Sequence, residues 1–180
     1  MTEQEKKTTI ESSGEYESRP EDRGEYERFL KIIARLRSAD GCPWDRAQTH
    51  ASLKKTCIEE ACELVCGINI YEATGNAENL KEELGDLLMQ VVLQARIAEE
   101  EGLFTMEDVC KGIADKMVRR HPHVFTEAKE SDPEKLHANW AEIKKNEKSG
   151  KEWMEEYLPR AFEESKELID VAVARKAGKE

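Results

Sequence analysis

Hydrophobic residues recur three and four positions apart through most of the chain, which is the spacing of amphipathic helices. In the first such stretch, Phe29, Ile33 and Leu36 fall on one face. No stretch shows the strict alternation of apolar and polar residues that is typical of a half-buried strand. The sequence therefore predicts an all-α fold, with helices at about 25–38, 52–73, 77–101, 105–120 and 132–148, and a last one from about residue 159.

Local signals mark several of the predicted helix ends. Thr105 and Asp108 have the T-x-x-D spacing of a capping box, which satisfies backbone N–H groups at a helix start. Asp132 followed by Pro133 is a second start signal, an N-cap residue before a proline in the first turn. Pro122 disfavours helix at the residue before it, so the preceding helix is expected to end near residue 120.

Two segments are predicted to lack regular helix. Residues 1–24 are polar and poor in apolar side chains, and we expect a flexible tail there. The segment "ADGCPWDRAQTH" is predicted to be a loop between the first two helices, with Trp44 as a structural plug. Residues 25–180 then form one domain that ends in a helical extension, because the length suits a single core.

Composition narrows the class of protein. No apolar run approaches the ~20 residues needed to span a bilayer, and the polar start of the chain has no apolar leader. The net charge of −11 argues against binding of nucleic acid or of an anionic membrane surface. The odd count of five cysteines, without secretory features, predicts reduced thiols and a cytoplasmic protein.

Two matched pairs of acids are the strongest candidate for chemistry. Glu60 and Glu63 lie three residues apart on one long helix, and Glu83 and Asp86 have the same spacing on the next. On a helical wheel each pair lies at the same flank of its helix's apolar stripe, so antiparallel packing would bring the four carboxylates together. They are either solvated surface acids or ligands of a divalent cation, and all-oxygen ligation selects Mg²⁺ or Mn²⁺.

Two rival metal sites fit less well. A di-iron site needs Glu-x-x-His on two helices, and neither acid pair contains a histidine. The thiols of Cys57, Cys62 and Cys66 fall on different sides of one helix, with Cys57 in the apolar stripe and the other two on the opposite flank. A site that used all three thiols would need the helix to face two ways, although a Cys62/Cys66 pair remains geometrically open.

Basic and aromatic residues form a second candidate group. Lys116, Arg119 and Arg120 end one predicted helix, where they either complement the helix dipole or clamp a phosphate group. Trp140 and Lys144 lie one turn apart on a later helix. The tryptophan either packs in the structure or stacks on a base beside a lysine that faces phosphate.

Five segments taken together resemble the MazG family of nucleoside triphosphate pyrophosphohydrolases: "GCPWDRAQTHASL", "EEACE", "EELGDLLMQVVLQA", "DKMVRRHPHVF" and "NWAEIKKNEK". The resemblance runs in order from about residue 26 to 175. Within the family, the chain is similar to the N-terminal domain of members that carry two tandem copies. It implies an all-α helical bundle completed by dimerisation around a Mg²⁺ site.

The resemblance also implies roles for individual residues. The family motif EExxE…ExxD assigns the metal to Glu60, Glu63, Glu83 and Asp86, with Glu60 also counted as catalytic. Glu59 would be an outer acid that orients the attacking water. The substrate-binding residues would be Lys116, Arg119, Arg120, Trp140 and Lys144.

The function expected from this resemblance is Mg²⁺-dependent hydrolysis of a nucleoside triphosphate to the monophosphate and pyrophosphate, by a homodimer or a dimer of dimers. A regulatory module that binds nucleotide with little turnover is the first alternative. A purely structural helical protein with solvated acids is the second.

Overall fold

The computed structural model describes residues 24–127 and 129–178, and these residues form helices without a β-strand. The all-α prediction is therefore confirmed for this part of the chain. The predicted tail lies almost wholly outside the described residues, because the first described position is Gly24. In chain order the elements are α1 (Gly24–Leu36), α2 (Pro43–Arg46), α3 (Lys54–Thr74), α4 (Glu78–Glu100), α5 (Met106–Arg120), α6 (Pro122–Phe125), α7 (Pro133–Glu147), the 3₁₀ helix η2 (Glu152–Glu156) and α8 (Leu158–Lys176).

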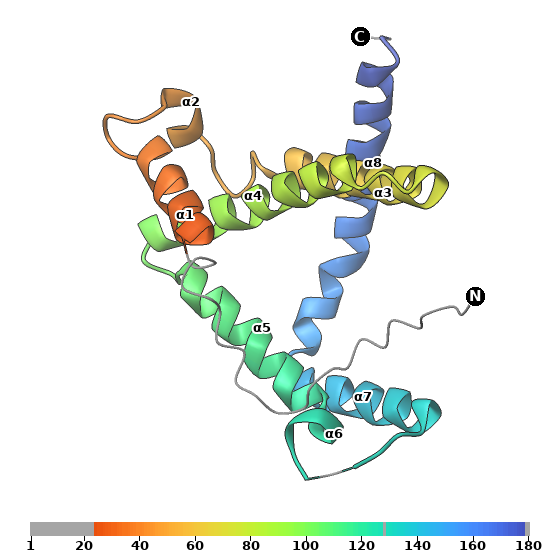
Figure 1. Ribbon diagram of the computed structural model, residues 1–180. Helices are drawn as coiled ribbons and strands as arrows, with labels where there is room; N and C mark the ends of the chain where they lie inside the picture. The colour runs from red at the N-terminus through yellow and green to blue at the C-terminus, as the bar shows by residue number, and fades with distance from the viewer. Residues whose placement is uncertain (1–23, 128, 179–180) are drawn as a thin grey trace, which may run out of the picture.

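The centre of the fold is the antiparallel pair α3 and α4, which lie side by side along their length (Figure 1). Gly75 ends α3 in the left-handed region, with φ 73°, and its N–H donates to the carbonyl of Tyr71 at 2.8 Å. Gly67 is the buried residue of α3, and a Cβ there would lie 3.0 Å from the Cα of Leu80. The close approach of the two helices explains why a glycine stands in a helix interior, where it lowers helix propensity.

A small apolar core joins α1 to the C-terminal half of α4. It is built from Ile33, Leu53, Val92, Leu93 and Ile97. The same end of the molecule is tied by Arg37, whose side chain is only 5% exposed. Its guanidinium donates to Glu100 on α4 at 2.8 Å and to the carbonyl of Gln48 at 3.2 Å, so one buried cation joins three segments.

The predicted caps are confirmed. The hydroxyl of Thr105 accepts from the backbone N–H of Asp108 at 3.2 Å, and the Asp108 carboxylate accepts from the Thr105 N–H at 2.9 Å. Asp132 accepts from the N–H of Glu134 at 3.0 Å and starts α7. The prediction for Trp44 is wrong, because its side chain is 75% exposed and so does not plug the loop.

Three short helices were not predicted. They are α2, α6 and η2, each of four or five residues. The helices α2 and α6 begin at a proline. Proline suits the first turn of a helix because its φ is fixed, but it is equally common in turns, so it does not distinguish the two. A stretch this short has no apolar periodicity that a sequence pattern could detect.

The remaining helices extend away from the central pair. In Figure 1, α8 crosses the central pair, where it packs against α3, while α5 runs from the end of α4 toward α7. Parts of the apolar stripes of α3 and α4 are exposed, with Val65 at 56%, Leu84 at 51% and Val91 at 41%. Among the described residues, no helix combines the length and the apolar character required to cross a membrane.

Candidate functional site

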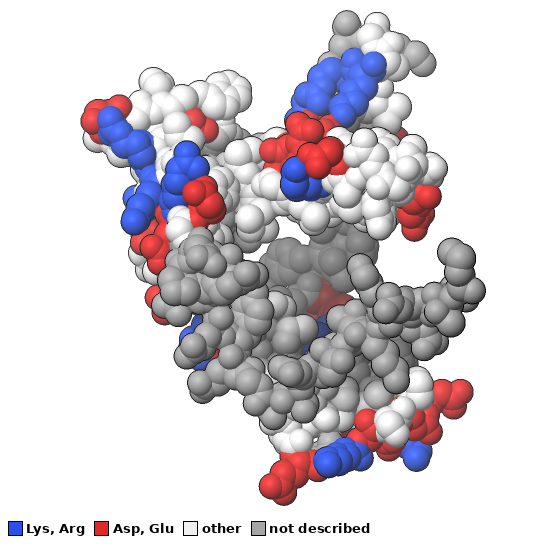
Figure 2. All heavy atoms as spheres, in the orientation of Figure 1, with Lys and Arg blue, Asp and Glu red and all other residues white. Residues whose placement is uncertain are grey.

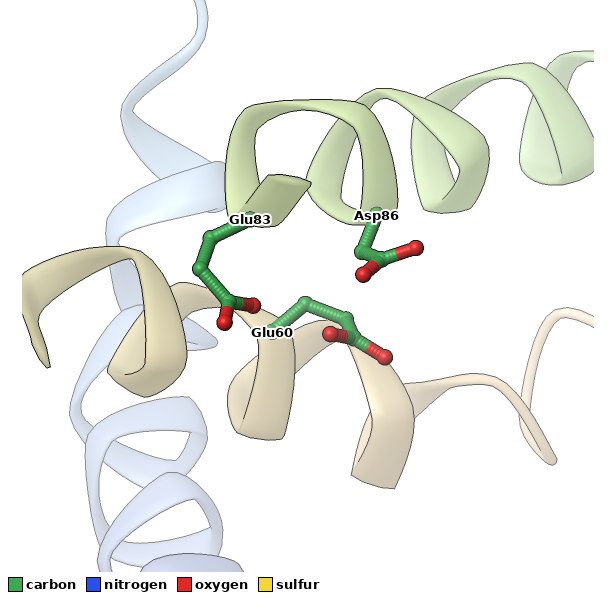
Figure 3. Close-up of side chains that lie close together, drawn as sticks. All are labelled: Glu60, Glu83 and Asp86. Carbon is green, nitrogen blue, oxygen red and sulfur yellow. The ribbon is translucent and has the colours of Figure 1, made fainter. Parts of the chain in front are cut away.

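Three of the four predicted metal-binding carboxylates come together between α3 and α4. Glu60 of α3 and Glu83 and Asp86 of α4 each offer one oxygen, and these atoms lie within 4.8 Å of one another. Figure 3 shows the three side chains pointing into the space between the two helices. The antiparallel packing that their matched spacing suggested is thus what brings them together.

These three carboxylates have no basic partner among the described residues. Burial raises the pKa of Glu60 above its ordinary value, and the neighbouring charges of Asp86, Glu63, Glu83 and Glu59 raise it further. Glu83 is buried and accepts one hydrogen bond, from the side-chain amide of Asn79 at 2.8 Å. The cluster therefore concentrates negative charge that no basic side chain of residues 24–127 or 129–178 balances.

The donor set fits a hard divalent cation. It consists of carboxylate oxygens alone, one from each of three residues, gathered within 4.8 Å of one another. Mg²⁺ and Mn²⁺ prefer such ligands, whereas a zinc site would draw on nitrogen or sulfur. A bound cation would also remove the repulsion that raises the pKa of Glu60.

The other two acids predicted for the site, Glu59 and Glu63, face α8 instead. Arg175 lies 2.9 Å from Oε2 of Glu59, and Lys55 lies 3.9 Å from its Oε1. Oε1 of Glu59 is buried and accepts no hydrogen bond. Glu63 forms an ion pair with Lys176, so it stands apart from the three-membered cluster.

The predicted basic residues lie at a separate cleft. Lys116, Arg119 and Arg120 line a hollow of about 600 Å³ together with residues of α7, η2 and α8. Arg119 and Arg120 both bind Glu147, at 2.6 Å each, and these guanidinium groups hold the pKa of Glu147 below its ordinary value. The lining has five basic residues and two acidic ones, so an excess of positive charge remains for an anionic ligand.

Trp140 borders this basic group. Its ring lies 5.0 Å from the ammonium of Lys144 and 5.3 Å from the guanidinium of Arg120, within the range of cation–π attraction. His137 stacks near the same ring, with centroids 6.5 Å apart. The predicted pairing of Trp140 with Lys144 is therefore present, together with an arginine from α5.

Within one chain, the carboxylate cluster and the basic cleft lie far apart. Leu158, the first residue of α8, lines the basic cleft, while Lys176, its last residue, pairs with Glu63. An α-helix rises 1.5 Å per residue, so the two ends are about 27 Å apart. One chain does not bring its predicted metal ligands and its predicted phosphate contacts to a single point.

Four residues that shape these two places were not predicted. Asn79 lies one helical turn before Glu83, and Glu147 neutralises two of the predicted phosphate contacts. Arg175 and Lys176 reach α3 from a hundred residues further along the chain. Of these residues, only Arg175 and Lys176 give a signal in the sequence, as a basic pair at the end of an amphipathic helix. Nothing near them in the sequence indicates that they pair with Glu59 and Glu63.

Comparison with known proteins identifies a family domain and several relatives of this chain. Residues 48–125 match the MazG nucleotide pyrophosphohydrolase domain. The chain is 51% identical over 128 residues to the "Uncharacterized protein YabN" of Bacillus subtilis (strain 168). The aligned segment covers 71% of this chain and 25% of that protein. It is 46% identical over 126 residues to the "Nucleoside triphosphate pyrophosphohydrolase/pyrophosphatase MazG" of Thermotoga maritima, covering 70% of this chain and 46% of that protein.

A further relative is the "Nucleoside triphosphate pyrophosphohydrolase" of Escherichia coli (strain K12), 42% identical over 126 residues, with 69% of this chain and 46% of that protein covered. The chain therefore spans less than half the length of each of these relatives. The carboxylates Glu60, Glu83 and Asp86 and the basic segment of α5 all fall inside the matched residues. Residues 48–125 of this chain therefore match a MazG nucleotide pyrophosphohydrolase domain, and the relatives that share this region are 42–51% identical to it.

Proposed function

We propose that this protein hydrolyses nucleoside triphosphates, ribo- or deoxyribo-, to the monophosphate and pyrophosphate in a Mg²⁺-dependent reaction. The observation that carries the proposal is the unpaired cluster of Glu60, Glu83 and Asp86 inside a MazG domain. Two of the relatives bear the name of this activity. Because the chain matches less than half of each, the activity of the whole relative is a proposal for this chain.

The metal-binding role falls to Glu60, Glu83 and Asp86, with Glu63, which pairs with Lys176, as the proposed fourth carboxylate. When bound there, Mg²⁺ or Mn²⁺ supplies charge neutralisation on phosphate oxygens and a lowered pKa for a bound water. Glu60, whose pKa is raised by burial and by the neighbouring carboxylates, is also assigned a catalytic role beside the metal. Glu59 has a buried oxygen that accepts no hydrogen bond, so it is suited to take a proton from the attacking water.

The substrate-binding role falls to the basic cleft. Lys116, Arg119 and Arg120 carry donors matched to the oxygens of a triphosphate. Trp140 offers its ring to a base, with Lys144 beside it for a phosphate oxygen. Arg119 and Arg120 would then exchange Glu147 for the substrate, a swap of one charge-assisted partner for another.

A second copy of the chain would join the two places. The acids of α3 and the basic cleft lie at opposite ends of α8, about 27 Å apart along that helix, so a complete site needs basic residues from a partner. The exposed apolar stripes of α3 and α4, including Val65, Leu84 and Val91, are the surface such a partner would cover. We therefore infer a homodimer or a dimer of dimers, testable by light scattering across a range of protein concentrations.

The test of the activity is a panel of nucleoside and deoxynucleoside triphosphates incubated with the protein and Mg²⁺, with monophosphate and pyrophosphate both measured. Wild type should release them in equal amounts, and Glu83→Gln should abolish release. Glu82→Gln, which alters an exposed acid next to Glu83, should leave the rate unchanged. Release that survives Glu83→Gln would overturn the assignment of the site.

A nucleotide-binding module with little turnover is the second candidate, and one observation favours it. The basic cleft, which keeps an excess of positive charge, is remote from the carboxylate cluster within one chain. Such a module would be stabilised thermally by nucleotide and release no pyrophosphate. Stabilisation without turnover in the same panel would select it.

A further inference from the structure

The C-terminal turn of α8 lies directly against the side of α3 that carries the acids. Its residues Ile169 and Val173 face Ile58 across an apolar hollow of about 240 Å³. Past these residues, Arg175 pairs with Glu59 at 2.9 Å, and Lys176 pairs with Glu63. Figure 2 shows basic side chains near the C-terminal end of α8 lying against acidic side chains of the central helix pair.

These two ion pairs divide the acids of the site into two groups. Glu59 and Glu63 are balanced by α8, whereas Glu60, Glu83 and Asp86 have no basic partner among the described residues. The division does not follow from sequence spacing, which puts Glu60 and Glu63 on the same flank of α3. It is produced by the position of α8.

We propose that Lys176 is a positioning residue that decides how many carboxylates the metal site contains. It competes with the divalent cation for Glu63, so that the docked α8 leaves three ligands and its release supplies a fourth. This inference rests on the proposed metal site and adds a residue from outside the matched segment 48–125.

The competition follows from electrostatics. Lys176 and the cation compete for the charge of Glu63, because an ammonium bound to this carboxylate repels a cation that approaches it. Competition of this kind is reciprocal: a change that weakens the Lys176 pair strengthens metal binding, and metal binding weakens the docking of α8. The pair is exposed, at 59% for Lys176 and 35% for Glu63, so the effect is modest in size.

Mn²⁺ affinity is the quantity that tests the proposal, measured by titration calorimetry on the full chain without nucleotide. Lys176→Met should tighten Mn²⁺ binding by about two- to five-fold, the range that an exposed ion pair allows. The gain should vanish in the double variant Lys176→Met/Glu63→Gln. Lys176→Arg, which keeps the pair, should bind as wild type does.

Lys166→Met is the matched control, because Lys166 is an exposed lysine of the same helix that pairs within α8, 3.6 Å from Asp170. Its Mn²⁺ affinity should equal that of wild type. The reciprocal effect is read by hydrogen–deuterium exchange, where Mn²⁺ should speed exchange over residues 169–176 of wild type. It should have no such effect when Glu63 is replaced by glutamine.

The outcomes separate this inference from the function on which it rests. If wild type binds Mn²⁺ and Glu83→Gln abolishes binding, the metal site holds. An affinity of Lys176→Met equal to or weaker than wild type then overturns the role of Lys176 alone. If wild type binds no Mn²⁺, the metal site and this inference both fail.

Discussion

Replacement of Glu60 by glutamine should change the sign of its effect on stability when a divalent cation is added. Without a cation, Glu60 lies close to Glu83 and Asp86 and has no basic partner in the described part of the chain, so its charge opposes folding. With a cation bound, the same charge becomes a ligand. Few substitutions at a surface acid would stabilise one state of a protein and destabilise the other.

The magnitude follows from the distances. Two unit charges 4.8 Å apart repel by about 0.9 kcal/mol in bulk water and about 3.5 kcal/mol at an effective dielectric constant of 20. Glu60 takes part in two such pairs and is partly exposed, so values near the lower limit apply. Removal of its charge should therefore stabilise the metal-free protein by about 2 kcal/mol, or about 4–8 °C in Tm for a chain of this size.

The assay is thermal unfolding at pH 8 in EDTA and in Mg²⁺. A ligand at 1,000 times its Kd stabilises the folded state by about 4.1 kcal/mol, so wild type should overtake Glu60→Gln once Mg²⁺ is in large excess. Glu82→Gln removes an exposed charge from the neighbouring turn of α4 and should behave as wild type in both buffers. An unchanged or lower Tm for Glu60→Gln in EDTA would refute the claim that these carboxylates repel one another.

Three further predictions concern the fold and its pH dependence. Arg37→Ala should lower the free energy of unfolding in urea by about 2 kcal/mol. It removes the hydrogen bonds of a buried guanidinium to Glu100 and to the carbonyl of Gln48, while Arg96 still pairs with Glu100. A loss below about 1 kcal/mol would contradict that role. Gly67→Ala should destabilise the fold by about 1 kcal/mol, because overpacking against Leu80, at about 1–3 kcal/mol, outweighs the gain in helix propensity of about 0.8–1.0 kcal/mol. The control Gly112→Ala, where the added Cβ meets open space, should stabilise the fold. Equal effects of the two substitutions would refute the close contact at Gly67. In EDTA, wild type should lose stability relative to Glu60→Gln as the pH rises from the unfolded pKa of about 4.3 through the raised folded pKa of Glu60, because the native state binds more protons than the unfolded state in that window. Above the window, the difference in stability between the two proteins should stay constant. A difference that does not change over the whole pH range would contradict the raised pKa.

The long helices could be predicted because their periodicity extends over many turns. The predicted limits of α3, α4 and α5 agree with the structure to within one or two residues, and the capping box at Thr105 is present. The matched spacing of the acid pairs was enough to expect Glu60, Glu83 and Asp86 together. Both results rest on patterns that lie within one helix or two adjacent ones.

The features that could not be predicted depend on segments far apart in the chain. Glu63 has the same local spacing as Glu60, yet α8 withdraws it from the cluster through Lys176, 113 residues later. Trp44 was expected to be buried from its residue type, but the short helix α2 leaves it facing solvent. Gly67 looks unfavourable when α3 is considered alone and is explained only by the approach of Leu80.

The central claim is tested most directly by phosphorus NMR of the products that the protein forms from a nucleoside triphosphate, with Mg²⁺ and with EDTA. The account predicts monophosphate and pyrophosphate in equal amounts with Mg²⁺, none with EDTA, and none from Asp86→Asn in either buffer. Diphosphate with inorganic phosphate, or undiminished turnover by Asp86→Asn, would contradict a carboxylate-bound cation as the centre of a pyrophosphohydrolase site.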